Sequence, residues 1–214
     1  MRLRLVQVLG VALTLLVMAA CGWMPTTDGQ SRASLLEGDT LPLNAFPDPV
    51  VRAKPTHAVQ EAAAEKARVD YISIPSMRTV IPIVVSRVVG GRAVVPAADQ
   101  VGWLNTSARP GARHGVTVLA GHLTTGPKGA DAGPLYGAEN LAKGAEVKVV
   151  WKSRTTTYRV SGVSKHARNA LPPRLFDPNG RGRLALITCT GPYVKGRDGQ
   201  WWLSRNAVIW AEKV

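Results

Sequence analysis

The sequence predicts a mainly β fold for its last two thirds, and three observations support this prediction. First, short runs rich in Val, Ile, Thr and Trp recur between residues 71 and 214. Second, clusters of glycine, proline and charged residues separate these runs and supply the turns. Third, only Pro134–Leu141 in this region has the character of a short helix. Seven or eight short strands in one such domain indicate a closed barrel or a sandwich.

Each expected strand is a run of four to eleven residues bounded by turn residues. The runs are Thr79–Val89, Arg92–Val95, Gly115–Ala120, Glu146–Trp151, Thr156–Val163, Leu184–Cys189 and Asn206–Ala211. We find no internal repeat among them, so a solenoid or propeller is not expected.

The first 24 residues are a membrane signal. Arg2 and Arg4 precede an uncharged run from residue 5 to 24, which is a positive n-region followed by an apolar h-region. An uncleaved signal-anchor helix is one interpretation. The stretch Met18-Ala19-Ala20-Cys21 also resembles a bacterial lipobox, which makes Cys21 a candidate for lipidation. A cleaved secretory peptide is the third possibility. All three place the rest of the chain on the extracytoplasmic face of the cell membrane.

Residues 25–70 are expected to form an extracytoplasmic linker. They contain five prolines, with seven acidic and five basic residues scattered among them. One or two helical turns are expected near residues 58–67. A partner-binding arm is the alternative function of this segment.

The domain from residue 71 to 214 is strongly basic. The whole chain has 27 Lys and Arg against 14 Asp and Glu, for a net charge of +13. The domain holds 20 of the bases and 7 of the acids, and therefore all of the net charge. Such a surface favours anionic partners, but the export signal argues against nucleic acid. The remaining candidate partners are phospholipid, teichoic wall polymers and lipid-linked pyrophosphate precursors. The alternative is a basic surface whose charge has no function. With only seven acidic residues in this domain, we expect no metal site. We also expect that the protein uses no cofactor and is a monomer.

A cysteine and a histidine are the candidates for chemistry. If Cys21 lies in or on the membrane, Cys189 is not expected to form a disulfide, and a thiol outside the cytoplasm then needs burial or a function. Cys189 is predicted to end a strand, before a break at Thr190-Gly191-Pro192. His122 also follows a predicted strand and precedes a glycine-rich loop. A nucleophilic cysteine needs a base or an imidazolium close by, and two strand ends can meet at one rim of a barrel. A buried structural cysteine and a turn histidine are the alternatives.

Several segments resemble the sortases, the cysteine transpeptidases of Gram-positive cell surfaces. The main ones are Ala120-Gly121-His122, Leu186-Ile187-Thr188-Cys189-Thr190-Gly191 and Arg205-Asn206-Ala207-Val208-Ile209-Trp210-Ala211. The resemblance covers roughly residues 70–214. The pair Gly102-Trp103 and the segment Thr188–Gly191 resemble class F of the actinobacteria most, whereas Gly121–Thr125 resembles class E. The resemblance implies a single closed eight-stranded sortase-like β-barrel with short helices and turns.

The resemblance also implies a reaction and its catalytic residues. Cys189 would attack the Thr–Gly carbonyl of an LPxTG-like sorting signal and form a thioacyl enzyme. His122 would protonate the leaving amine and then deprotonate the incoming amine of a lipid-linked peptidoglycan precursor. Arg205, just before the last expected strand, would position substrate and stabilise the oxyanion, with Arg197 as the fallback. A slip of one residue would turn Arg205 to the other face of its strand.

Four residues are expected to bind or support the substrate. By the same resemblance, Thr188 supports the substrate or the strand. Leu171, Pro172 and Pro173 fall where sortases have the loop that walls the substrate groove, and an apolar, proline-stiffened wall suits a Leu-Pro ligand. An ordinary surface loop is the alternative for these three residues.

Three other functions share parts of this pattern. A cysteine hydrolase of wall peptides would use the same Cys189 and His122 but resolve the thioester with water. An L,D-transpeptidase is disfavoured because its compact His, Ser, Gly and Cys cluster is missing. A membrane-tethered module that binds wall polymer would use only the basic surface.

Overall fold

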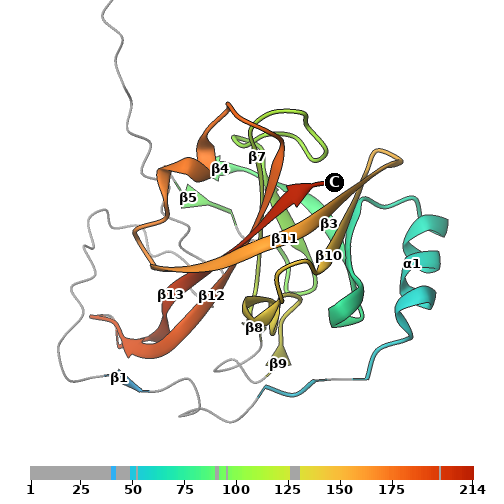
Figure 1. Cartoon of the computed structure of the whole chain (residues 1–214). Helices are drawn as coiled ribbons and strands as arrows, with labels where there is room; N and C mark the ends of the chain where they lie inside the picture. The colour runs from blue at the N-terminus through green and yellow to red at the C-terminus, as the bar shows by residue number, and fades with distance from the viewer. Residues whose placement is uncertain are drawn as a thin grey trace, which may run out of the picture.

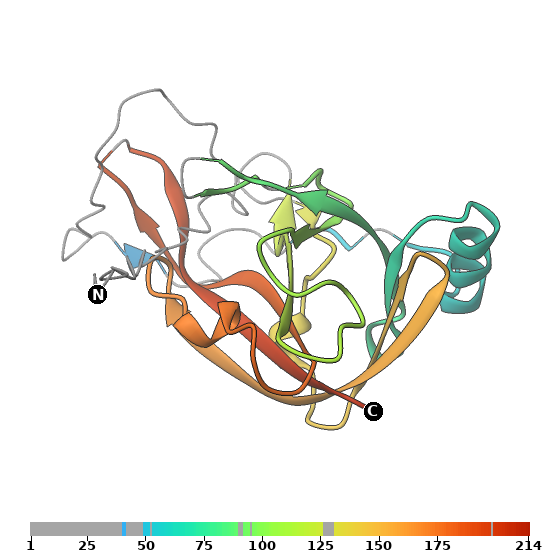
Figure 2. The same cartoon turned by 90° about the horizontal axis from the view of Figure 1, so that it is seen from above.

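The described part of the chain forms a closed β-barrel with helix α1, His57–Lys66, on its outside (Figures 1 and 2). The computed structural model describes residues 40–41, 49–51, 53–89, 92–94, 96–125, 131–197 and 199–214. The signal segment 1–24, with Cys21, and most of the first half of the linker lie outside these residues. No helix in the described ranges combines the length and the apolar character needed to span a bilayer.

Eight strands close the barrel in the order β12-β13-β11-β10-β2-β3-β6-β7, and β7 pairs back onto β12. The barrel strands are β2 Tyr71–Ile74, β3 Thr79–Ser86, β6 Val101–Leu104, β7 Val116–Gly121, β10 Glu146–Trp151, β11 Arg154–Ala167, β12 Arg183–Lys195 and β13 Trp201–Lys213. The ladders are antiparallel except for β3–β6 and β7–β12, which are parallel. The prediction of a closed eight-stranded barrel is therefore confirmed.

The remaining elements are short and lie outside the barrel. They are β1 Thr40–Leu41, β4 Val88–Val89, β5 Arg92–Ala93, β8 Thr124–Thr125, β9 Asp131–Ala132, helix α1 His57–Lys66, and the 3₁₀ turns Pro75–Met77, Ala138–Asn140 and Pro173–Phe176. Strand β1 extends the sheet beyond β12, and β4–β5 and β8–β9 form separate hairpins.

Four sequence-based boundaries were wrong. The run Thr79–Val89 divides into β3 and β4, and the helix expected at Pro134–Leu141 is only a turn that contains the 3₁₀ segment. The linker contains a ten-residue helix rather than one or two turns. The last two strands are also longer than expected, because they form a hairpin whose paired backbones support each other beyond the apolar runs.

The core has two layers. Large side chains from all eight barrel strands fill the interior, among them Ile72, Ile83, Leu119, Val149, Tyr158, Leu186 and Ile209. A second cluster lies on the outer face of β7, β12 and β13, where Ala185, Ile187, Val208 and Trp210 are covered by Leu175. Leu175 belongs to the β11–β12 loop, so this loop packs on the outside of the barrel over those three strands.

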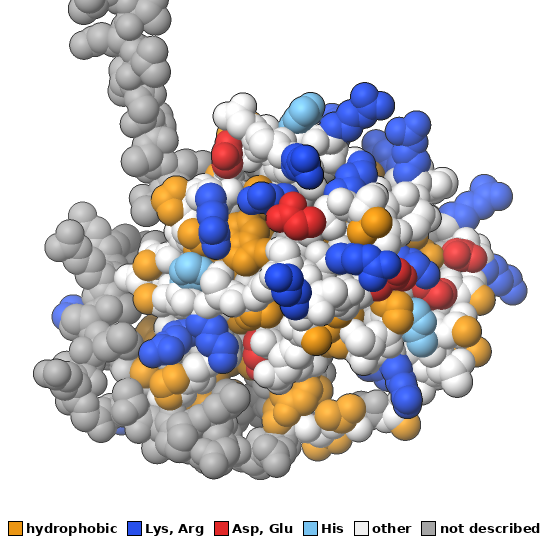
Figure 3. Space-filling view, in the orientation of Figure 1, with side chains coloured by type: hydrophobic (Ala, Val, Ile, Leu, Met, Phe, Trp, Pro, Cys, Tyr) orange, Lys and Arg blue, Asp and Glu red, His pale blue; other side chains and the backbone are white. Residues whose placement is uncertain are grey.

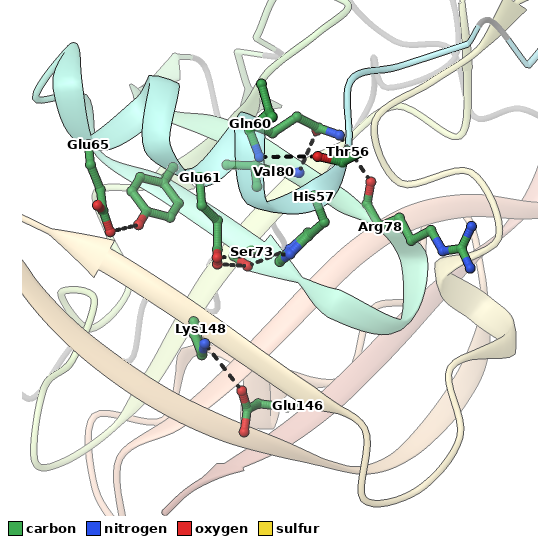
Figure 4. A network of polar contacts seen from close by, with 12 residues as sticks. Thr56, His57, Gln60, Glu61, Glu65, Ser73, Arg78, Val80, Glu146 and Lys148 are labelled. Atoms are coloured by element: carbon green, nitrogen blue, oxygen red, sulfur yellow. Dashed lines mark hydrogen bonds and ion pairs between the residues drawn. The ribbon is translucent and has the colours of Figure 1, made fainter.

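Helix α1 is attached to the barrel by polar side chains (Figure 4). None of its residues is buried. The Ser73 hydroxyl, on β2, donates to Glu61 Oε1 at 2.6 Å, and His57 Nε2 lies 2.9 Å from the same hydroxyl oxygen. Gln60 accepts from the Val80 backbone N–H at 3.1 Å and donates to the Arg78 carbonyl at 3.2 Å. Because little apolar surface is buried in this contact, its hydrogen bonds decide whether the helix stays docked.

Candidate active site

Cys189 lies inside β12, directly opposite Asn206 of β13. The prediction that it ends a strand was wrong. The strand continues to Lys195 through an irregularity between Thr190 and Tyr193, where Gly191 has φ +86°. This left-handed conformation favours glycine, and it lets the strand bend without ending.

The alternation of β12 places Cys189 on the outer face of the barrel. Ala185 and Ile187 belong to the outer cluster, whereas Leu184 and Leu186 belong to the interior. Cys189 has the parity of the outer pair. It is 3% exposed and clusters with Leu123, Tyr193 and Leu203. A side chain in this position faces the same side of the sheet as the β11–β12 loop.

Cys21, the other cysteine of the sequence, lies outside the described residues. The thiolate is the nucleophilic form of cysteine, so chemistry at Cys189 requires a reduced sulfur.

His122 directly follows β7, as predicted, and is half-buried. Its Nε2 lies 3.3 Å from the Pro96 carbonyl oxygen. A carbonyl only accepts, so we infer from this contact that Nε2 carries a proton. The His122 backbone carbonyl accepts from the Leu135 N–H at 3.1 Å, which holds the segment after β7 in place.

The parallel β7–β12 ladder brings the two candidates together. Its pairs run from Val116 opposite Arg183 to Ala120 opposite Ile187. His122 and Cys189 each lie two residues beyond the last pair of this ladder, and continuing the same register would bring them next to each other. Neighbouring strands lie about 4.8 Å apart, so side chains at such adjacent positions can meet. The sequence predicted strand ends that meet at a rim; the structure instead has the end of one strand beside the interior of another.

Arg205 lies close to Cys189 in the β12–β13 ladder, but its side chain has the opposite alternation. It lies opposite Thr190, so strict alternation gives it the other face of the sheet from Cys189. Its side chain is exposed and lies against Gly191, where an added Cβ would come within 3.1 Å of Arg205 Cγ. The absence of a side chain at Gly191, two residues beyond Cys189, therefore leaves space for the Arg205 side chain. Arg197, the fallback, lies in the turn between β12 and β13, eight residues beyond Cys189.

Thr188 is fully buried and lies opposite Ala207, whose side chain belongs to the barrel interior. Its hydroxyl oxygen is buried and has no hydrogen-bond partner within the described part of the chain. This position fits support of the strand rather than contact with a substrate.

The three loop residues expected to wall the groove lie on the outer side of the barrel, the side that strand alternation gives Cys189. Leu171 packs with Phe176 against the outer cluster that contains Ile187, and Pro172 and Pro173 lead into the 3₁₀ turn. The Arg174 guanidinium lies 4.4 Å from the centre of the Trp210 ring, which ties the turn to β13. The loop and Cys189 thus share one face of the barrel.

Two residues near Cys189 were missed by the sequence analysis. Asn206 is 1% exposed, and its side-chain amide donates to the Arg168 carbonyl at 2.9 Å. The Arg168 guanidinium stacks over Trp202 at 4.8 Å. Identifying these two residues from the sequence would have required the register between β12 and β13, because neither residue lies near Cys189 in the sequence. Within the described ranges, no group of three or more His, Cys, Asp or Glu side chains could hold a metal ion.

Comparisons with known proteins concern the family and the fold of the chain. The family model described as "Sortase domain" matches residues 72–214. Sortase C-1 from Actinomyces oris superposes with a TM-score of 0.54 at 21% identity, over 84% of this chain and 90% of that one. Sortase A from Corynebacterium diphtheriae superposes with a TM-score of 0.52 at 24% identity, over 68% of this chain and 60% of that one. Both likenesses concern the fold. No curated protein matches the chain.

Proposed function

This chain belongs to the sortase family, and on that premise we propose that it is a cysteine transpeptidase that anchors surface proteins to the cell wall. Its substrate is an LPxTG-like sorting signal, cleaved between Thr and Gly. The acceptor is an amine of a lipid-linked peptidoglycan precursor. The site acts on the extracytoplasmic face of the cell membrane, where an uncleaved helix or a lipidated Cys21 holds the chain.

The observation that supports this proposal is the β7–β12 ladder, whose last pair, Ala120 opposite Ile187, lies two residues before His122 and Cys189. A thiolate and an imidazolium at adjacent positions stabilise each other, which is the activated state of a nucleophilic cysteine. With His122 in this role, the mechanism needs no further general base from the residues that adjoin Cys189 in the sequence.

The reaction has two steps. The Cys189 thiolate attacks the threonine carbonyl, and the C–N bond to glycine breaks as the His122 imidazolium donates its proton to the leaving amine. An amine of the wall precursor then attacks the thioester, His122 takes the proton from that amine, and the C–S bond breaks. The Cys189 thiolate is regenerated, so the cycle needs no cofactor.

Arg205 is the cation that we assign to the substrate. Its exposed side chain lies against Gly191, two residues from Cys189, and its role is to donate to the carbonyl oxygen that becomes negative. The loop with Leu171, Pro172 and Pro173 forms the wall for the apolar Leu-Pro part of the signal.

The direct test is the intact mass of the full chain, in reducing buffer, after incubation with an LPxTG peptide with and without a glycine-terminated or diaminopimelate-type amine. We expect an acyl adduct on Cys189 that the amine converts into a ligated product. Cys189→Ala should abolish the adduct, and an adduct that persists in this variant would refute the assignment.

A cysteine hydrolase is the second candidate, because it would use the same pair of side chains. Release of the free acid in the presence of excess amine would identify it. If no adduct forms with the LPxTG peptide, with or without the amine, the positively charged surface becomes the feature on which the function depends.

A further inference from the structure

A cavity of about 700 Å³ lies at the end of the barrel where the chain terminates. It is bounded by the loop before β7, the tip of the β10–β11 hairpin and the last residues of β13. Figure 1 shows that these three segments come together near the C-terminus. In Figure 3, which has the same orientation, Lys and Arg side chains gather on the upper right of the molecule, toward which this hairpin points.

The cavity is far from Cys189. Lys213 lines it, and Asn206, the partner of Cys189, lies seven residues away along β13. At about 3.3 Å per residue this is a separation of about 23 Å along the strand. The cavity is therefore separate from the candidate active site, and the proposed transpeptidation does not use it.

The charge of the lining is entirely positive. Arg109, Lys152, Arg154 and Lys213 line the cavity, and none of its lining residues is acidic. Glu212, the neighbour of Lys213 in the chain, is bonded to Arg183 at 3.1 Å instead. Four cations around one cavity raise its potential and attract anions.

The walls are aromatic and held in place. The rings of Trp103 and Trp151 meet edge to face, with centroids 5.1 Å apart. Trp103 Nε1 donates to the Ala108 carbonyl at 3.0 Å, which fixes the loop before β7 to the barrel.

Two more hydrogen bonds anchor the same loop at Gly111. Its backbone N–H donates to the hydroxyl of buried Tyr158 at 3.1 Å, and its carbonyl accepts from Lys213 Nζ at 3.0 Å. The cavity is thus formed before any ligand binds, which lowers the entropy cost of binding.

We propose that this cavity binds a phosphate group carried on a small uncharged organic moiety such as glycerol. Arginine matches the geometry of phosphate through paired N–H donors, and the two lysines add point charges. The tryptophan walls contact the uncharged part of the ligand, and indole rings can pack against its C–H surface. Such a group occurs both in anionic phospholipid headgroups and as a free phosphodiester.

The test is calorimetric titration of the full chain in phosphate-free reducing buffer with two probes. Glycerophosphoglycerol represents the headgroup, and inorganic pyrophosphate represents phosphate alone. Arg109→Ala and Arg154→Ala should each weaken binding of glycerophosphoglycerol about tenfold, the loss expected for one charge-assisted contact. Lys165→Ala and Lys195→Ala, which remove exposed cations outside the lining, should change the affinity less than about twofold, as expected of distant surface charges.

The outcomes separate the sources of the ligand. Glycerophosphoglycerol binding stronger than pyrophosphate binding supports a headgroup-type phosphodiester with contact to the tryptophans. Equal binding of both probes, lost in the same two variants, supports recognition of the phosphate alone. No binding of either probe at millimolar concentration, or equal losses in the lining and control variants, would overturn the proposal. Since Lys213 in the cavity lining lies about 23 Å along β13 from the partner of Cys189, adduct formation with the peptide tests the proposed function separately.

Discussion

Asn206 lies directly opposite Cys189 in the β12–β13 ladder, and its side-chain amide is bonded to the Arg168 carbonyl. The amide therefore ties the strand beside Cys189 to the start of the β11–β12 loop. That loop covers the outer face of the barrel, where the groove is expected. The position of the loop and the position of the nucleophile are thus coupled through one buried side chain.

Arg205→Ala should lower kcat/KM for the LPxTG peptide about 100-fold, because it removes a cation from the developing oxyanion. Arg205→Lys should recover little, since an ammonium cannot present the same pair of donors. Steady-state kinetics with the reduced full chain measures both effects.

Arg168→Ala is the matched comparison for Arg205, because the Arg168 guanidinium stacks over Trp202 instead of lying against Gly191. We expect a smaller loss of kcat/KM than in Arg205→Ala. A larger loss in Arg168→Ala would transfer the substrate-binding role to that arginine.

Gly121→Ala should displace His122 and lower the rate of adduct formation. A Cβ on Gly121 would lie 2.8 Å from Val101 Cγ1 and 3.1 Å from Leu135 Cδ1, so the end of β7 must shift. Gly162→Ala is the control, because a Cβ there meets no atom within 4 Å. Equal adduct rates in the two variants would show that the close packing at Gly121 does not position the histidine.

Ser73→Ala should release helix α1 from the barrel. The hydroxyl is fully buried between Glu61 and His57, and its loss leaves the carboxylate without a close donor, at a cost of about 1–3 kcal/mol. Hydrogen exchange of the α1 amides should accelerate while that of β12 stays slow. Unchanged exchange in α1 would mean that the Gln60 contacts suffice to hold the helix.

The free energy of unfolding should fall as the pH rises from about 10 to 12. Burial, and then the nearby Glu65 carboxylate, raise the pKa of Tyr71 to about 12. The unfolded phenol ionises near 10, so the folded state keeps its proton longer. The stabilisation is complete below pH 10 and is lost as the pH rises through 12.

Tyr71→Phe should remove part of this pH dependence, about 2 kcal/mol between pH 9 and 12. Burial also raises the pKa of Tyr158, so some dependence should remain in the variant. Denaturant titrations at several pH values measure the difference, and parallel curves for the two proteins would contradict the assignment to Tyr71.

Much of the fold was predictable from local sequence. Six of the seven expected β-rich runs coincide with barrel strands, because alternating burial favours branched and aromatic side chains. His122 at the end of β7 was predictable for the same reason. The short strands β2 and β6 were not among these runs, and the run Arg92–Val95 lies outside the barrel. The lengths of β12 and β13 were not, since a hairpin extends by pairing between strands rather than by the apolar character of each one.

The sequence by itself determined which side chains can do chemistry here, because one cysteine and one histidine stand beside β-rich runs in the family's motifs. Only the tertiary structure decided how they meet. The parallel β7–β12 ladder joins segments 67 positions apart, and its last pair, Ala120 opposite Ile187, lies two residues before His122 and Cys189. The β12–β13 pairing places Arg205 opposite Thr190, one residue beyond Cys189, and Gly191 leaves room for the arginine side chain. Pairing between distant strands depends on the packing of the whole barrel, and no local pattern encodes it.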